Sequence, residues 1–157
     1  MYRRQASLYL DSPHLETQRL RHNPIQARLI PAHVTLCRED EVDDWVAFAA
    51  NLKSLSPFEL SLGFGSPIRE NNFVFLPVRD GLADFHEFRR LLLTHEPRVH
   101  TPHVTLIHPR NGECTDSIFA EITRSIPPFR VTFREVMLIE QSGDSPWNVV
   151  ARVGART

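Results

Sequence analysis

A tetrapeptide that occurs twice constrains the fold of this chain more than any other feature. The sequence His-Val-Thr-Leu begins at His33 and again at His103, an offset of 70 residues. Residues 57–62 and 128–133 also resemble each other loosely, at an offset of 71. Matching offsets at separate positions indicate two copies of one structural unit.

The residues around these anchors predict the same order of elements in both halves, namely strand, helix, strand, helix, strand. Alternating or β-branched apolar residues predict strands, and apolar residues three or four apart predict helices. The predicted strands cover 6–10, 32–36, 58–64, 73–78, 102–107 and 129–133, with a closing pair at 136–140 and 147–153. The predicted helices cover 42–54, 82–92 and 118–126, and a first one that starts after Ser12 and ends at Pro24.

The chain therefore forms one domain over residues 1–157 in this interpretation, because no linker separates the two units. The first repeat spans about 6–65, the second about 72–135, and the closing strand pair about 136–153. A chain of this length can bury the core of one such domain.

Composition excludes several classes of protein. A net charge of -1 argues against a dedicated DNA binder, and Lys53 is the single candidate for lysine-based ligation chemistry, outside any motif for it. Cys37 and Cys114 are too far apart for a disulfide scaffold or a cysteine zinc site. The apolar run at 6–10 is too short for a signal peptide, so we expect none, and no apolar run approaches the ~20 residues of a membrane span. We expect a cytoplasmic monomer with no DNA or membrane partner.

The repeated tetrapeptide carries the candidate chemistry. On a strand, His33 and Thr35 point to one face, and His103 and Thr105 do the same in the second copy. If the two units face each other, two His/Thr pairs line one cleft. One imidazole can then take a proton while the other donates one. The hydroxyls can hydrogen-bond phosphate oxygens, so neither a metal nor another cofactor is required. A duplication that preserved only the fold would have let these outward-facing residues drift.

The chain resembles the two-histidine (2H) phosphoesterase superfamily, and within it the 2′-5′ RNA ligase-like branch of RNA 2′,3′-cyclic phosphodiesterases. The resemblance rests on both His-x-Thr motifs, their spacing, the Pro-Phe-x-[Leu/Val] strand and the closing strand pair. It implies an α+β, bilobal fold, in which two duplicated β-α-β-α-β units have antiparallel sheets that face each other across a central cleft. It also implies catalytic roles for His33 and His103 and phosphate-binding roles for Thr35 and Thr105.

The expected activity is metal-independent hydrolysis of a 2′,3′-cyclic phosphate, or of a related 2′-5′ phosphodiester, at an RNA end or in a nucleotide. Run backwards with an RNA 5′-hydroxyl as nucleophile, the same chemistry would join ends without ATP. The natural substrate stays open. We assign the base to His103, although the symmetry of the two motifs permits the reverse.

Four further residues are candidates for substrate binding. Tyr9 could stack on a base or be an ordinary residue at the surface edge. Phe75 occupies a broadly equivalent place in the second unit, with core packing as its alternative role. Arg38 and Arg110 follow the two motifs and could bind phosphate, or could be solvated loop charges.

Two alternative functions remain. His100, His103 and His33 could form a three-histidine metal site. Against this, His100 and His103 are three residues apart, so on a strand their side chains would point to opposite faces. The chain could also be a non-catalytic module that binds nucleotides or RNA ends, which would not require two proton-transfer groups.

Overall fold

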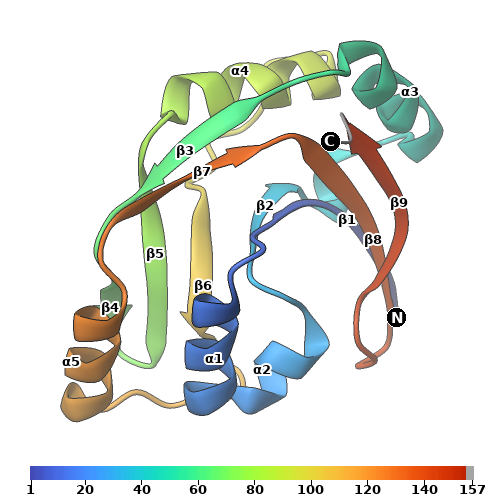
Figure 1. Ribbon diagram of the computed structural model, residues 1–157. Coiled ribbons are helices and arrows are strands. Elements are labelled where there is room, and N and C mark those ends of the chain that lie inside the picture. The colour runs from blue at the N-terminus through green and yellow to red at the C-terminus, as the bar shows by residue number, and fades with distance from the viewer. Residues whose placement is uncertain (155–157) are drawn as a thin grey trace.

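The computed structural model describes residues 1–154 and consists of one antiparallel sheet with helices packed around it (Figure 1). Residues 155–157 of the predicted domain lie outside the described part. The strands are β1 (Tyr2–Tyr9), β2 (His33–Cys37), β3 (Leu60–Phe64), β4 (Ile68–Glu70), β5 (Phe73–Asp80), β6 (His103–Ile107), β7 (Phe129–Phe133), β8 (Glu135–Ser142) and β9 (Asn148–Gly154). The helices are α1 (Pro13–His22), α2 (Pro24–Leu29), the 3₁₀ turn η1 (Glu39–Glu41), α3 (Trp45–Leu55), α4 (Leu82–Leu93) and α5 (Asp116–Ser125).

The predicted α+β class and the order of its main elements are confirmed, and three elements were not predicted. Pro24 does end α1, but it is also the first residue of α2, where a proline costs no hydrogen bond. The short strand β4 and the turn η1 are the other two. Helix α3 starts three residues later than predicted, because the Asp44 carboxylate caps the N–H groups of Val46 and Ala47.

The strands of the two repeats share one hydrogen-bonded sheet, which differs from the predicted pair of sheets. The order is β7-β3-β5-β6-β2-β1-β8-β9, with β4 beside β5. The physical reason is that the two motif strands, β2 and β6, pair directly through Val34 and Val104. Strand β3 belongs to the first repeat in sequence but lies between β5 and β7 of the second. The sheet curls strongly, as Figure 1 shows.

The two motif strands pair with their neighbours in the same register, which supports a repeated unit. In the first half, Ser7 of β1 lies opposite Thr35 of β2. In the second half, Phe75 of β5 lies opposite Thr105 of β6. A register irregularity occurs just before Ser7 and again just before Phe75. Phe75 is therefore the counterpart of Ser7.

This register corrects one expectation about the candidate binding residues. Tyr9 lies opposite His33, and the residue opposite His103 is Pro77. Tyr9 and Phe75 are thus not equivalent positions. The register makes Ser7, two residues before Tyr9, the counterpart of Phe75, and Pro77 the counterpart of Tyr9.

The apolar residues of both motifs form the centre of the core, as the strand alternation predicts. Val34, Leu36 and Val104 have no exposed surface, and Leu106 is 3% exposed. They belong to the same cluster as Phe85 of α4. This packing anchors the motif strands on one face and leaves their polar residues on the other. None of the helices in the described part of the chain has both the length and the hydropathy of a membrane span.

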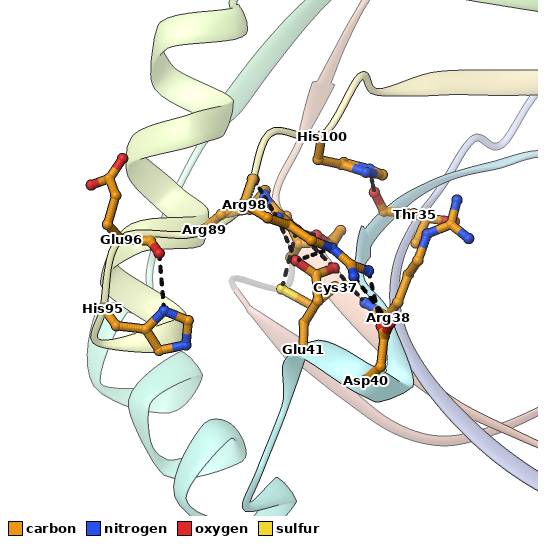
Figure 2. A network of polar contacts seen from close by, with 11 residues as sticks. Thr35, Cys37, Arg38, Asp40, Glu41, Arg89, His95, Glu96, Arg98 and His100 are labelled. Atoms are coloured by element: carbon orange, nitrogen blue, oxygen red, sulfur yellow. Dashed lines mark hydrogen bonds and ion pairs between the residues drawn. The ribbon is translucent and has the colours of Figure 1, made fainter.

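A buried ion pair ties α4 to the end of the first motif strand (Figure 2). Arg89 donates to both carboxylate oxygens of Glu41, at 2.5 and 3.3 Å, and to the carbonyl of Leu36 in β2. Only 1% of the Arg89 side chain and 4% of that of Glu41 are exposed. Arg98 completes the group by forming two hydrogen bonds to Asp40. The network fixes the segment that follows Thr35.

Candidate active site

Both predicted His/Thr pairs lie in one cleft with a volume of about 420 Å³. His33 and Thr35 project from β2, and His103 and Thr105 from β6, because alternation places all four on the face opposite the core. The volume falls within the range of small-molecule sites. The cleft can thus hold a ligand of nucleotide size.

The two histidine rings are oriented in the same way. Nδ1 of His33 lies 2.8 Å from the carbonyl oxygen of Pro31, and Nδ1 of His103 lies 2.9 Å from that of Thr101. A carbonyl can only accept, so each Nδ1 carries a proton and donates it to the carbonyl two residues earlier. In the neutral ring, Nε2 is then the proton acceptor. Both rings offer the same nitrogen for proton transfer.

The first histidine is electrostatically biased toward its neutral form. Burial lowers the pKa of His33 to about 4, and the positive charges of Arg19 and Arg38 act in the same direction. The hydrogen bond to the Pro31 carbonyl opposes this shift without cancelling it. At neutral pH, Nε2 of His33 is therefore a free acceptor.

The threonine of the first motif is held by a residue that the sequence did not single out. Gln5 Nε2 donates to Thr35 Oγ1 at 3.1 Å and to Ser7 Oγ at 2.8 Å. Because the threonine hydroxyl accepts from Gln5, its own hydrogen is available to another acceptor. Gln5 thus prepares Thr35 to donate into the cleft.

The cleft is lined by cations without any carboxylate among the described residues. Its wall includes Arg3, Arg19, Arg38 and Arg110, of which Arg38 and Arg110 are the two arginines proposed from the sequence. Guanidinium groups match the geometry of phosphate oxygens. The wall composition suits a phosphorylated ligand.

Arg19 also joins the two motif strands structurally. Its side chain is 2% exposed and donates to the carbonyl of Thr105 at 3.3 Å and to that of Ile30 at 2.9 Å. Glu16 pairs with Arg19 at 3.0 Å and also accepts from the N–H of Ala32, next to His33. Helix α1 thereby holds β2 and β6 in fixed relation.

The other two predicted binding residues do not line this cleft. Tyr9 packs with Ile30 and Met137 and borders a neighbouring pocket, and its ring centroid is 6.4 Å from that of His33. Phe75 stacks on Phe73 at 4.7 Å and meets the His103 ring edge-on at 5.5 Å. Phe73, rather than Phe75, contributes to the cleft wall.

A hydrogen-bond network centred on Asn23 positions the loop that carries His108 and Arg110. Asn23 is 1% exposed, accepts from the His108 N–H at 2.8 Å and donates to Asn111 Oδ1 at 3.0 Å. The Arg110 N–H in turn donates to His108 Nδ1 at 3.1 Å. The side chain of His108 also contributes to the cleft wall.

Replacing Asn23 by alanine is expected to lower the free energy of unfolding by about 1–3 kcal/mol, because the His108 N–H loses its acceptor. Urea denaturation followed by circular dichroism measures this loss. Asn148→Ala, on the exposed strand β9, is the control and should change stability by no more than about 0.5 kcal/mol. Equal losses in the two variants would show that the network does not stabilise the loop.

The residues proposed for a three-histidine metal site are not brought together. His100 points to the first motif strand, where its Nε2 donates to the Thr35 carbonyl at 2.9 Å, and its ring stacks on Phe85. Among residues 1–154, no group of three or more histidine, cysteine, aspartate or glutamate side chains is placed to hold a metal.

Comparison with solved structures identifies the fold. E. coli LigT complexed with phosphate is 18% identical, with a TM-score of 0.61 over 97% of this chain and 96% of that one. E. coli LigT complexed with NADP+ is 16% identical, with a TM-score of 0.63 over 99% and 98%. A structure described as a phosphoesterase is 16% identical, with a TM-score of 0.61 over the full length of both chains. A search of curated proteins finds no match.

The family comparison covers most of the chain and both motifs. The model of the 2'-5' RNA ligase superfamily matches residues 9–145, which include His33, Thr35, His103 and Thr105. The match agrees with the LigT-like fold. On this evidence, the chain belongs to the 2'-5' RNA ligase superfamily.

Proposed function

We propose that this chain is a metal-independent phosphodiesterase that hydrolyses 2′,3′-cyclic phosphates of nucleotides or RNA ends, with His33 and His103 as its acid–base pair. The observation that carries the proposal is the matched orientation of the two imidazoles in one cation-lined cleft. Paired groups of this kind suit a reaction that needs one proton removed and another supplied. Structures of E. coli LigT contain phosphate, ATP or 3'-AMP as a bound ligand, which supports a nucleotide substrate here.

In the proposed reaction, Nε2 of His33 takes a proton from water while the water oxygen bonds to phosphorus. The bond from phosphorus to one ribose oxygen breaks, and His103 donates a proton to that oxygen from Nε2. The low pKa of His33 supports this direction and reverses our assignment of the base from sequence. With an RNA 5′-hydroxyl in place of water as the nucleophile, the same step would break the bond from phosphorus to the 3′-oxygen and form a 2′-5′ bond.

The remaining polar groups of the cleft stabilise the charged phosphorane-like transition state. Thr35 and Thr105 donate hydrogen bonds to the non-bridging oxygens, and Arg38 and Arg110 supply positive charge beside them. These groups are held by the protein before substrate binds, since Gln5 fixes Thr35 and the Asn23 network fixes the loop of Arg110. Such preorganised donors contribute more than solvent could.

Hydrolysis of the four 2′,3′-cyclic nucleotides in excess EDTA tests the proposal. Turnover that persists in the chelator is expected, with a single phosphomonoester isomer as product. Loss of activity in EDTA and its return with zinc would contradict the metal-independent mechanism. Binding of the cyclic nucleotides without turnover would favour the non-catalytic alternative.

The pH dependence of kcat/KM tests the role of His33. With His33 as the base, kcat/KM is expected not to fall on acidification until about pH 4, and below that to fall about tenfold per pH unit, because protonated His33 cannot accept. An acid limb near pH 6.5, where an unperturbed histidine titrates, would contradict this assignment.

Folding must be followed in the same pH series. The pKa of His33 is lower in the folded than in the unfolded chain, so the unfolded chain binds more protons between about pH 6.5 and 4. Stability therefore decreases as the pH falls through this interval. Circular dichroism at each pH separates loss of the base from loss of the fold.

A further inference from the structure

A second pocket adjoins the histidine cleft, and an arginine stands where the two meet. This flanking pocket has a volume of about 230 Å³. It shares four wall residues with the cleft, namely Arg3, Gln26, Arg110 and Trp147. Because the shared residues line both spaces, a ligand longer than one nucleotide can extend from the cleft into the flanking pocket.

Arg3 is held in place by neutral groups. Its guanidinium donates to Gln141 Oε1 and lies over the Trp147 ring, 5.3 Å from the ring centroid. Gln141 is itself 3% exposed and is fixed by a hydrogen bond from its Nε2 to the Ser145 carbonyl at 2.9 Å. The backbone N–H of Trp147 donates to the Leu29 carbonyl at 2.8 Å. Both supports of Arg3 are therefore anchored.

Arg3 forms no ion pair with a carboxylate among the described residues, although Asp144 also lines the flanking pocket. Its neighbour Arg4 projects to the other face of β1 and pairs with Glu140 at 3.2 Å. Arg4 thus has the structural role of a surface ion pair, whereas Arg3 presents a fixed, unpaired cation to the boundary between two ligand spaces. A guanidinium in this state is suited to a second phosphate group.

We propose that Arg3 binds the internucleotide phosphate next to the scissile one, and that the flanking pocket receives the adjoining nucleoside. The substrate class is then an RNA end of at least two nucleotides with a 2′,3′-cyclic phosphate, rather than a cyclic mononucleotide. This inference rests on the proposed function and deepens it. A cyclic mononucleotide carries one phosphate, and in the proposed function this phosphate is bound by the His/Thr pairs, Arg38 and Arg110. It has no second phosphate for Arg3 to bind.

The test compares kcat/KM for a cyclic mononucleotide with that for a dinucleotide ending in a 2′,3′-cyclic phosphate. A preference of about 10-fold or more for the dinucleotide is expected, since a charge-assisted hydrogen bond contributes about 1.5–3 kcal/mol. Arg3→Gln should remove most of the preference. Arg4→Gln is the matched control on the same strand and should retain it.

A dinucleotide with an uncharged methylphosphonate linkage separates the phosphate contact from contacts to the nucleoside. Wild type should lose most of its preference with this substrate, and Arg3→Gln should cause little further change. Equal kcat/KM values for mononucleotide and dinucleotide, with Arg3→Gln lowering both alike, would assign Arg3 to the scissile phosphate. That result overturns this inference and leaves the proposed function standing. Absence of turnover with every substrate would overturn both.

Discussion

Replacing His33 or His103 by asparagine is expected to lower kcat/KM for a 2′,3′-cyclic substrate by about 10²–10⁴-fold, the usual contribution of a general acid or base. Asparagine is chosen because its amide nitrogen can replace Nδ1 in the hydrogen bond to the carbonyl of Pro31 or Thr101. Of the two ring nitrogens, only Nε2 then has no replacement. The variants should remain folded, so the loss reports on proton transfer.

Steady-state kinetics and thermal denaturation of the same preparations provide the measurement. His86→Asn is the control, because His86 lies on the exposed face of α4, where its partner is Glu96. The double variant at positions 33 and 103 should lose much less than the product of the two single losses, because both groups act in one step. Full activity in either single variant would rule out the paired mechanism.

Replacing Arg89 by methionine is expected to lower the free energy of unfolding by about 3–5 kcal/mol. The substitution leaves the Glu41 carboxylate almost fully buried without its main partner, and the Leu36 carbonyl also loses a donor. Hydrogen bonds from Arg89 hold the pKa of Glu41 below its usual range although burial opposes this. Without Arg89, we expect Glu41 to take up a proton or the segment after β2 to open.

Chemical denaturation of three variants separates charge burial from lost packing. Arg90→Met changes the next residue, whose ion pair with Glu87 is exposed, and should change stability little. Adding Glu41→Leu to Arg89→Met should restore part of the stability, because it removes the unpaired buried charge. A loss in Arg89→Met no larger than in Arg90→Met would mean that the buried pair is not a main support of the fold.

The residues that the sequence identified best are those whose side chains follow from strand alternation. The parity of the motif strands was sufficient to predict that Thr35 and Thr105 share a face with the histidines, and the repeat predicted that both pairs serve one site. Alternation along β1 could also have indicated Arg3 and Gln5, because residues two apart on a strand point to the same face and Ser7 lies opposite Thr35. We missed them because the predicted strand began at residue 6, whereas β1 begins at Tyr2 by pairing with β8.

Features that depend on long-range pairing could not be predicted. The place of β3 between β5 and β7 requires knowledge of which edges meet in space. The burial of Arg89 and of Arg19 depends on carbonyl partners on other elements, and no local pattern marks an arginine as buried. Tyr9 was proposed to bind substrate, and its position outside the cleft has a related cause. It packs against Ile30 and Met137, which come from other parts of the chain.

The pairing of β1 with β8 has a consequence for how the protein is made. Ser7 leaves the ribosome 130 residues before Met137, its partner across the sheet. Contacts so distant along the chain form slowly, because a long loop must close before they contribute stability. The strand that bears Arg3 and Gln5 therefore lacks one of its two neighbours until β8 has been synthesised. A ribosome-bound chain that stops before β8 would carry both His-x-Thr motifs and still lack a finished catalytic cleft.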